Sequence, residues 1–255
     1  MSQTATPDLS GQHVFITGAA RGLGRSMAEK LARCGATVAV SDVDAAGIEE
    51  VARGIRGTGG VALSYAVDVA KRDQFLEAAA QFAHHCGRID AVVNNAMWLK
   101  YGPIEHITPE TLERMTAIGI SGSVWGAQAL LAHYDAARGG AIINMASPVA
   151  ERGFPNTAAY SLVKGAIVTL TKVLAAELGP RNIRVNAIAP GSVPTPGALG
   201  LNDKAEYERR TRTIPLRRLG REEDNAEACA FLLSGAASFI NGEILHVDGG
   251  IAAAG

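Results

Sequence analysis

Short runs of apolar residues alternate with longer amphipathic segments along most of the chain. The apolar runs are rich in β-branched residues and bounded by polar or glycine-rich turns, which is typical of strands buried on both faces of a sheet. These runs occupy residues 13–18, 37–42, 61–68, 89–96, 141–147, 183–190 and 243–250. The intervening segments have helical periodicity. They cover about 22–34, 44–55, 72–86, 109–135, 158–178 and 223–234.

Strands that alternate with helices imply right-handed crossovers between parallel strands. The sequence therefore predicts an α/β fold whose doubly wound, seven-stranded, mostly parallel sheet is flanked by helices. We expect a flexible N-terminal tail over residues 1–10 and a single domain over 11–255. A substrate lid is expected over about 192–215, because it includes the longest irregular stretch, 192–203, and long loops in compact domains are usually functional or disordered.

Composition narrows the classes of partner. The 255 residues are 47% hydrophobic, which is enough for a large core, and the formal net charge is −1. Without a basic stripe, neither nucleic acid nor an anionic membrane surface is expected as the main partner. No apolar run approaches the roughly 20 residues of a membrane span, and no secretion signal is expected at the N-terminus.

Cysteine and histidine usage points to a cytoplasmic protein without a metal site. The three cysteines lie far apart, which suits reduced thiols in the cytoplasm and not a disulfide framework. The six histidines show no spacing typical of metal ligands.

Polar residues and glycines follow six of the predicted strands at the points where the strands end. They are Gly18, Asp42, Asp68, Asn94 with Asn95, Ser147, and Pro190 with Gly191. The carboxyl ends of parallel strands meet at one edge of a sheet, and α/β sheets bind ligands there. A single polar residue after a strand means little, because turns need polar residues. Six strands that end in this way indicate a binding site.

The segment TGAARGLG, residues 17–24, joins the first predicted strand to the first predicted helix. Its glycines at 18, 22 and 24 let the backbone turn sharply and approach a pyrophosphate, which the free N–H groups of a helix N-terminus attract. The pattern is weak alone. Its position between a strand and a helix favours dinucleotide binding over a plain tight turn.

Asp42 follows Gly18 by 24 positions, the spacing expected for a carboxylate that accepts the hydroxyls of the adenosine ribose. A carboxylate there repels a 2′-phosphate, so NAD is expected and NADP is less favoured. Arg21 points the other way, because its guanidinium is able to meet a phosphate. The ordinary alternative for Asp42 is that it caps the next helix.

Tyr160 and Lys164, in the segment YSLVK, are one helical turn apart and share a helix face. A free tyrosine has a pKa near 10, which is too high for an efficient acid–base group at neutral pH. An ammonium about 5 Å away, at an effective dielectric near 20, would lower that pKa by roughly two units. Taken alone, the pair is more typical of a solvated helix face.

The motifs TGAARGLG, NNA, Ser147, YSLVK, APG and VDGG occur together, in an order and at a spacing that resemble the short-chain dehydrogenase/reductase family. The resemblance covers roughly residues 10–251. It implies that residues 11–255 form a single Rossmann-like, dinucleotide-binding and catalytic domain of an oxidoreductase, usually a homotetramer, that uses a nicotinamide cofactor. With Asp42 favouring NAD, the expected reaction is NAD-dependent interconversion of a secondary alcohol and a ketone by hydride transfer.

The resemblance also implies roles for individual residues. Ser147 would hold the substrate oxygen, Tyr160 would act as general acid and base, and Lys164 would assist Tyr160 and bind the nicotinamide ribose. The expected cofactor-binding residues are Gly18, Arg21, Gly22, Leu23, Gly24, Asp42, Asp68, Val69, Asn95, Ala96, Tyr160, Lys164, Pro190, Val193 and Thr195.

Two positions depart from the family pattern. Met97 follows NNA where the family usually has glycine, and Gly119 stands where the resemblance implies an asparagine of a proton relay. A glycine inside a helix costs about 1 kcal/mol relative to alanine and suits a local bend. We expect the helix to be interrupted near Gly119, an asparagine there to be tolerated, and the enzyme to be active. The alternatives are a catalytically weak NAD-binding protein and a dehydratase or epimerase on the same fold.

Other candidate residues have less specific patterns. Three aromatic residues near strand ends are as typical of a core as of a substrate pocket. They are Trp98, Tyr101 and Phe154. Three arginines in the expected lid are more typical of a solvated helix face than of an anion site. They are Arg209, Arg210 and Arg212.

Overall fold

A seven-stranded sheet forms the centre of the molecule. The computed structural model describes residues 7–197 and 204–254. The strand order is β3-β2-β1-β4-β5-β6-β7, and every neighbouring pair is parallel. The strands are β1 (His13–Thr17), β2 (Thr37–Asp42), β3 (Val61–Ala66), β4 (Ala91–Asn94), β5 (Gly140–Met145), β6 (Ile183–Pro190) and β7 (Ile244–Val247). This order confirms the predicted doubly wound fold, with its switch point between β1 and β4.

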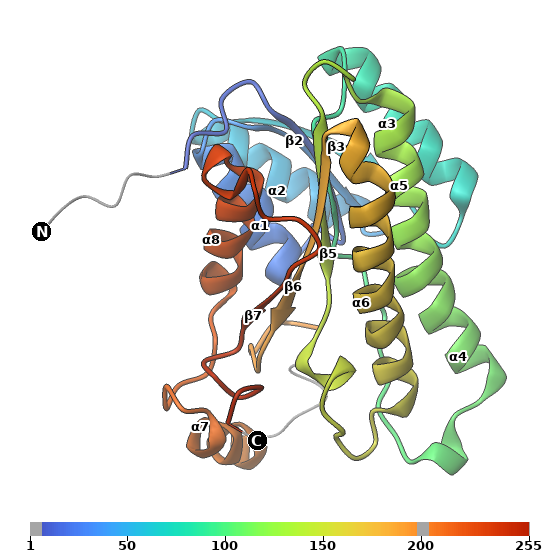
Figure 1. The fold of residues 1–255 in the computed structure, drawn as a ribbon, viewed down its shortest axis with the longest axis vertical. Coiled ribbons are helices and arrows are strands. Elements are labelled where there is room, and N and C mark those ends of the chain that lie inside the picture. The colour runs from blue at the N-terminus through green and yellow to red at the C-terminus, as the bar shows by residue number, and fades with distance from the viewer. Residues whose placement is uncertain (1–6, 198–203, 255) are drawn as a thin grey trace, which may run out of the picture.

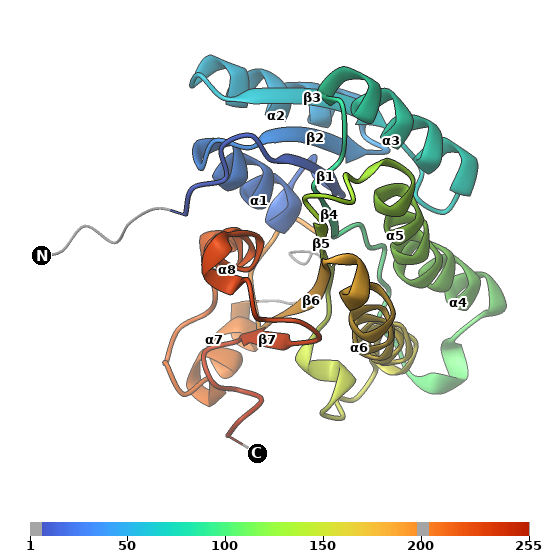
Figure 2. The same ribbon diagram turned by 45° about the horizontal axis from the view of Figure 1, so that its top comes forward.

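Helices cover both faces of the sheet, as Figures 1 and 2 show. One layer contains α1 (Gly22–Arg33), α2 (Ala45–Gly57) and α8 (Glu222–Leu233). The other contains α3 (Arg72–Cys86), α5 (Gly122–His133) and α6 (Ala158–Leu178), with α4 (Pro109–Thr116) leading into α5. A buried hydrophobic core lies under each layer, and these two cores hold the strand ends in register. Helix α7 (Lys204–Thr213) lies apart from both layers, beyond the carboxyl ends of the strands (Figure 1).

Several strands are shorter than the apolar pattern predicts. β3 ends at Ala66 and β5 ends at Met145, two residues before the predicted ends of these strands. The residues that follow are still buried, since Val67 is 3% exposed and Ala146 is 2% exposed. An apolar pattern in the sequence indicates burial and not hydrogen bonding within a sheet. It therefore continues into buried loops, and the predicted strands come out too long.

The predicted helix over 109–135 is interrupted, as expected from Gly119. A π-helical turn, Ala117–Ser121, separates α4 from α5, and Gly119 is buried within it. The hydroxyl of Ser123 donates a hydrogen bond to the Gly119 carbonyl over 2.8 Å. By length and composition the segment Pro109–His133 is apolar enough to cross a membrane. The segment packs against α3, α6 and β4, so it is part of one of the two helical layers of this fold.

The ends of the predicted tail and lid need correction. Leu9 is buried, and its N–H donates to the Cys34 carbonyl over 2.8 Å, so the packed chain begins before residue 11. Residues 1–6 of the expected tail and 198–203 of the expected lid lie outside the described residues. Helix α7 falls within the expected lid. Its sequence, KAEYERRTRT, lacks the apolar stripe by which the other helices were predicted.

Candidate active site

One cavity of about 1590 Å³ runs along the carboxyl ends of the strands. It extends from β1 and β2, past the ends of β4 and β5, to the segment after β6 and to α7. Among the residues predicted for the site, Gly24 alone does not line it. The residues that do are Gly18, Arg21, Gly22, Leu23, Asp42, Asp68, Val69, Asn95, Ala96, Ser147, Tyr160, Lys164, Pro190, Val193 and Thr195.

The turn after β1 touches the turn after β4. Gly18 has φ +66°, and a Cβ there would lie 2.7 Å from the Ala96 Cα, so only glycine fits. Gly24 packs behind this turn, which explains why it does not line the cavity: a Cβ on Gly24 would lie 2.1 Å from the Gly18 carbonyl oxygen. Arg21 is the N-cap of α1 and makes no side-chain capping bond. This helix N-terminus at the cavity wall fits the phosphates of a dinucleotide.

Hydrogen bonds fix the switch point between β1 and β4. The Asn95 amide nitrogen donates to the carbonyls of Thr17 over 2.9 Å and of Gly18 over 3.0 Å. The Thr17 hydroxyl accepts from the backbone N–H groups of Asn95 and Ala96 over 3.1 and 3.0 Å. In the next layer the Asn94 side chain donates to Asn144 over 2.9 Å, and both residues are buried. The backbone that would meet a cofactor is therefore held on several sides.

Two carboxylates lie at the β2 and β3 end of the cavity. Asp42 ends β2, and its Oδ2 accepts from the Ala20 N–H over 3.4 Å, which places it beside the turn after β1. The N-cap of α2 is Asp44, which accepts from the Gly47 N–H over 3.0 Å. The capping role considered for Asp42 thus belongs to Asp44. Asp68 lies after β3, and Arg21 lines the same end of the cavity.

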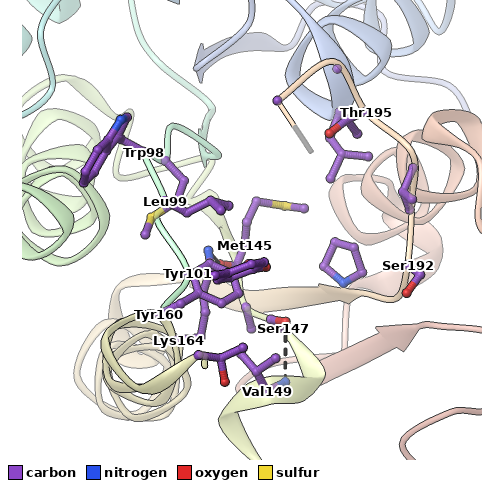
Figure 3. Close-up of a pocket in the computed structure, with 18 of the residues that line it drawn as sticks. Trp98, Leu99, Tyr101, Met145, Ser147, Val149, Tyr160, Lys164, Ser192 and Thr195 are labelled. Carbon is purple, nitrogen blue, oxygen red and sulfur yellow. Dashed lines mark hydrogen bonds between the residues drawn. The ribbon is translucent and has the colours of Figure 1, made fainter. Parts of the chain in front are cut away.

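Ser147, Tyr160 and Lys164 come together in the middle of the cavity (Figure 3). Ser147 follows β5 and is buried, with its Oγ accepting from the Val149 N–H over 3.4 Å. Tyr160 and Lys164 lie on the first turns of α6. The Lys164 Nζ donates to the Met145 carbonyl over 2.6 Å and lies 5.5 Å from the centroid of the Tyr160 ring.

Burial dominates the proton affinities of the pair. Burial lowers the pKa of Lys164 to about 8. Burial also raises the pKa of Tyr160 above its ordinary value, and the neighbouring Tyr101 raises it further, whereas a hydrogen bond with Ser147 lowers it in part. In the protein itself, burial therefore outweighs the lowering of the Tyr160 pKa that the sequence led us to expect from Lys164.

A second tyrosine, Tyr101, packs against Tyr160. Tyr101, from the segment after β4, packs edge-on against Tyr160 with 5.6 Å between ring centroids, as Figure 3 shows. Burial raises the pKa of Tyr101, and the positive charge of Arg210 on α7 lowers it in part. Tyr101 thus contacts the centre of the cavity on one side and lies close to the lid helix on the other.

Side chains that the sequence did not single out complete this end of the cavity. They include Leu99, Arg114, Met145, Val149, Arg152 and Ile251. They come from separate segments, so no local spacing marks them. Of the three lid arginines, Arg209 and Arg210 line the cavity and Arg212 does not, so the interpretation of the three as a solvated helix face stays a prediction. Ion pairs to Glu206, at 2.7 Å from Arg209 and 2.6 Å from Arg210, tie both guanidiniums to one carboxylate that also lines the cavity.

The two departures from the family pattern touch one another. A Cβ added to Gly119 would lie 2.9 Å from the Met97 sulfur and 2.5 Å from the Val163 Cγ1. The Met97 thioether therefore packs directly on the glycine backbone of the π-helical turn, and Val163 precedes Lys164 on α6. A side chain at 119 would require Met97 and Val163 to shift, and the tolerance of an asparagine there stays a prediction.

Comparisons with known proteins identify relatives along nearly the whole chain. The family model described as Enoyl-(Acyl carrier protein) reductase matches residues 18–252. A 3-oxoacyl-[acyl-carrier-protein] reductase from Thermotoga maritima is 33% identical over 243 residues, covering 95% of this chain and 98% of the relative.

Solved structures agree with this result. A 3-ketoacyl-(acyl-carrier-protein) reductase from Brucella melitensis in complex with NADH is 37% identical, with a TM-score of 0.90 over 96% of this chain and 100% of that one. A protein assigned as an NAD(P)-dependent gluconate 5-dehydrogenase from Beutenbergia cavernae, with bound NADP, is 33% identical. Its TM-score is 0.93 over 98% of this chain and 100% of that one.

Proposed function

The chain belongs to the short-chain dehydrogenase/reductase family of nicotinamide-dependent enzymes acting on CH–OH and C=O groups, and from that premise we propose that it interconverts a secondary alcohol and a ketone with NAD. The observation that carries the proposal is the meeting of Ser147, Tyr160 and Lys164 in one cavity, beside a glycine turn that fits a dinucleotide. A protein that only bound a nucleotide would have no need of this arrangement.

The reaction needs a proton to move as the hydride moves. The nicotinamide, when bound, supplies the hydride acceptor or donor. The Ser147 hydroxyl holds the substrate oxygen. In reduction the Tyr160 phenol gives its proton to the ketone oxygen, and in oxidation the Tyr160 phenolate takes the proton of the alcohol. Because burial raises the pKa of Tyr160, its phenol is protonated at neutral pH, which suits the reductive direction.

Lys164 is proposed to serve the oxidative direction. Its Nζ is 5.5 Å from the centroid of the Tyr160 ring, where a positive charge stabilises the phenolate that must be present before the alcohol proton can be taken. A pKa of about 8 leaves this amine charged at neutral pH and able to lose its proton just above it. The Met145 carbonyl, 2.6 Å from Nζ, holds the amine in place.

NAD is proposed as the cofactor because of Asp42. Its carboxylate lies beside the turn after β1, where it would accept the ribose hydroxyls and repel a 2′-phosphate. Titration of both cofactors tests this, with tighter binding of NAD expected. Asp42→Ala should narrow the difference about tenfold, and Arg21 is then the residue that would hold the phosphate. A preference for NADP in the unchanged protein would refute the assignment.

A screen of secondary alcohols and ketones, followed by NADH absorbance, tests the reaction itself. Turnover with net oxidation or reduction of the cofactor is expected for at least one class of compound. The two alternatives predict other results. A catalytically weak NAD-binding protein would bind NAD without turnover, and a dehydratase or epimerase would convert substrate with no net change in NADH.

We also propose a cytoplasmic homotetramer. Its support is the outer face of α6, where Leu162 is 64% exposed and Val173 is 52% exposed, although both are apolar. The cysteines of the described chain are all free thiols, as suits a reducing compartment. Light scattering at micromolar concentration should give four times the mass of the chain, and a monomer would contradict the assembly.

A further inference from the structure

The cavity carries opposite charges at its two ends. At the β2 and β3 end, two carboxylates, Asp42 and Asp68, face one guanidinium, that of Arg21. On the side of Tyr160 and the lid, the described lining residues include four arginines and a single carboxylate, Glu206. The four are Arg114, Arg152, Arg209 and Arg210. The whole chain has a net charge of −1, so this local excess of positive charge does not follow from the composition.

The lid helix brings two of these charges to one place. Glu206 accepts from the Nε of Arg210 over 2.6 Å and from Arg209 over 2.7 and 2.8 Å. These hydrogen bonds lower the pKa of Glu206 to about 2, so the carboxylate stays ionised. The carboxylate and both guanidiniums line the cavity. The Nη1 of Arg210 also lies 3.4 Å from the Ser192 hydroxyl, which orients the guanidinium toward the segment after β6.

Tyr101 lines the cavity together with Arg210 and Tyr160. The charge of Arg210 lowers the pKa of Tyr101 in part, and the ring of Tyr101 packs edge-on against Tyr160 at 5.6 Å. In Figure 3 the segment that bears Ser192 lies across the cavity from Leu99. The cavity lining also includes apolar side chains, among them those of Leu99, Val149 and Ile251. A substrate whose carbonyl carbon meets Tyr160 therefore shares the cavity with both apolar side chains and arginines.

We propose, on the basis of the function assigned above, that the substrate is an oxo or hydroxy acid with an apolar spacer between its reacting carbon and an anionic group. Arg210 binds that anion, and the Tyr101 hydroxyl is a second donor to it. A guanidinium offers a planar pair of N–H donors that matches a carboxylate, and such charge-assisted bonds are roughly twice as strong as neutral ones. The ion pair with Glu206 uses the Nε of Arg210 and positions the guanidinium.

Matched pairs of ketones test this inference without requiring turnover. The probes are 4-oxocyclohexanecarboxylate with its uncharged carboxamide, and 4-oxopentanoate with 4-oxopentanamide. Their dissociation constants are measured by NADH fluorescence on enzyme saturated with NADH. For at least one pair the carboxylate should bind about tenfold more tightly, which corresponds to about 1.4 kcal/mol. Added salt should reduce the difference, because mobile ions screen the charge.

Arg210→Gln should remove the preference for the carboxylate and change the affinity for the carboxamide by no more than about threefold. Arg212→Gln is the matched control, because Arg212 lies on the same helix and does not line the cavity. That control should keep the full preference. Tyr101→Phe should lower the preference by a smaller factor than Arg210→Gln, since it removes a neutral donor.

Four results would overturn the inference: equal affinities within both pairs, binding of none of the probes, a loss of both probes in Arg210→Gln, or an unchanged preference in that variant. If Arg210→Gln weakened NADH binding and left the probe preference intact, the arginine would serve the cofactor phosphates instead. Failure of the assigned reaction is distinguishable. Probes that bound with the expected preference while no ketone was reduced would support the anion site and reject the reaction.

Discussion

The two ends of the cavity are built by different means. At the β1 end, the wall is backbone: the Gly18 turn lies against Ala96, and the Asn95 amide is hydrogen-bonded to the carbonyls on either side of the turn. At the lid end, the wall is side chains from separate segments, joined by a ring contact at Tyr101 and by ion pairs to Glu206. A backbone wall accepts one shape of ligand, whereas a wall of side chains changes its chemistry with single substitutions.

Substitutions at the two ends of the cavity should also differ in their effect on the free energy of unfolding. Changes at the β1 end disturb packing and buried hydrogen bonds, which are expensive to lose. Exposed ion pairs such as those of the lid contribute little to folding. Substitutions in the lid are therefore expected to change which substrates bind, and substitutions in the turn to change whether the protein holds a cofactor at all.

The largest effect is expected at Tyr160, which lies between the two ends. Tyr160→Phe keeps the ring and removes the hydroxyl that moves the proton, so turnover should fall roughly 10²–10⁴-fold. Cofactor binding should stay within a fewfold, because the turn after β1 is untouched. Steady-state rates and an NAD titration measure the two quantities. Tyr101→Phe is the matched control and should lose much less turnover, so near-normal activity in the Tyr160 variant would reject the mechanism.

Gly18→Ala should distort the turn after β1 that forms the backbone wall of the cavity. The new Cβ would lie 2.7 Å from the Ala96 Cα on a backbone with φ +66°, so both turns must shift. We expect NAD affinity to fall by more than tenfold and the thermal midpoint to drop. Gly54→Ala is the control, because a Cβ at Gly54 meets nothing within 4 Å and lies inside α2. That change should stabilise the protein by about 1 kcal/mol. Normal NAD binding by Gly18→Ala would show that the turn does not shape the cofactor site.

The contact between the π-helical turn and α6 should show strong coupling. Gly119→Ala places a Cβ 2.5 Å from the Val163 Cγ1, and a β-branched side chain on a helix has little freedom to move away. Overpacking of this kind costs about 1–3 kcal/mol. Turnover should fall as well, because Val163 precedes Lys164 on α6. Gly119→Ala combined with Val163→Ala should recover most of both losses in a double-mutant cycle, measured by denaturant unfolding and steady-state rates. Additive effects would show that the two residues do not compete for space.

The difference between the backbone wall and the side-chain wall also explains which site residues could be predicted from the sequence. The residues at the β1 end of the cavity form a pattern within short segments of the sequence. Gly18 and Asp42 stand at fixed distances from strand ends, so their place in the cavity was predictable. The bend at Gly119 was predictable too, because glycine is costly inside a helix. Arg114, Arg152 and Ile251 reach the cavity only because the fold brings distant segments together. Arg210 resembles any solvated helix residue until the direction of α7 is known. Likewise, no pattern of a single segment could show that Met97 fills the space beside Gly119.

The smallest effect concerns the buried amine between the two ends. The pKa of Lys164 is about 8 in the folded protein against 10.5 for an ordinary lysine, because burial disfavours its charge. Between these values the unfolded chain holds a proton that the folded protein lacks, so stability should rise with pH by up to about 1.4 kcal/mol per unit. Urea unfolding of the cofactor-free protein at pH 8 and 9 measures this slope. Lys164→Met should remove it, whereas Lys172→Met, at an exposed position on the same helix, should keep it. Parallel stability curves for the protein and its Lys164 variant would mean that the amine is charged at both pH values, and that solvent reaches the reaction centre between the backbone wall and the lid.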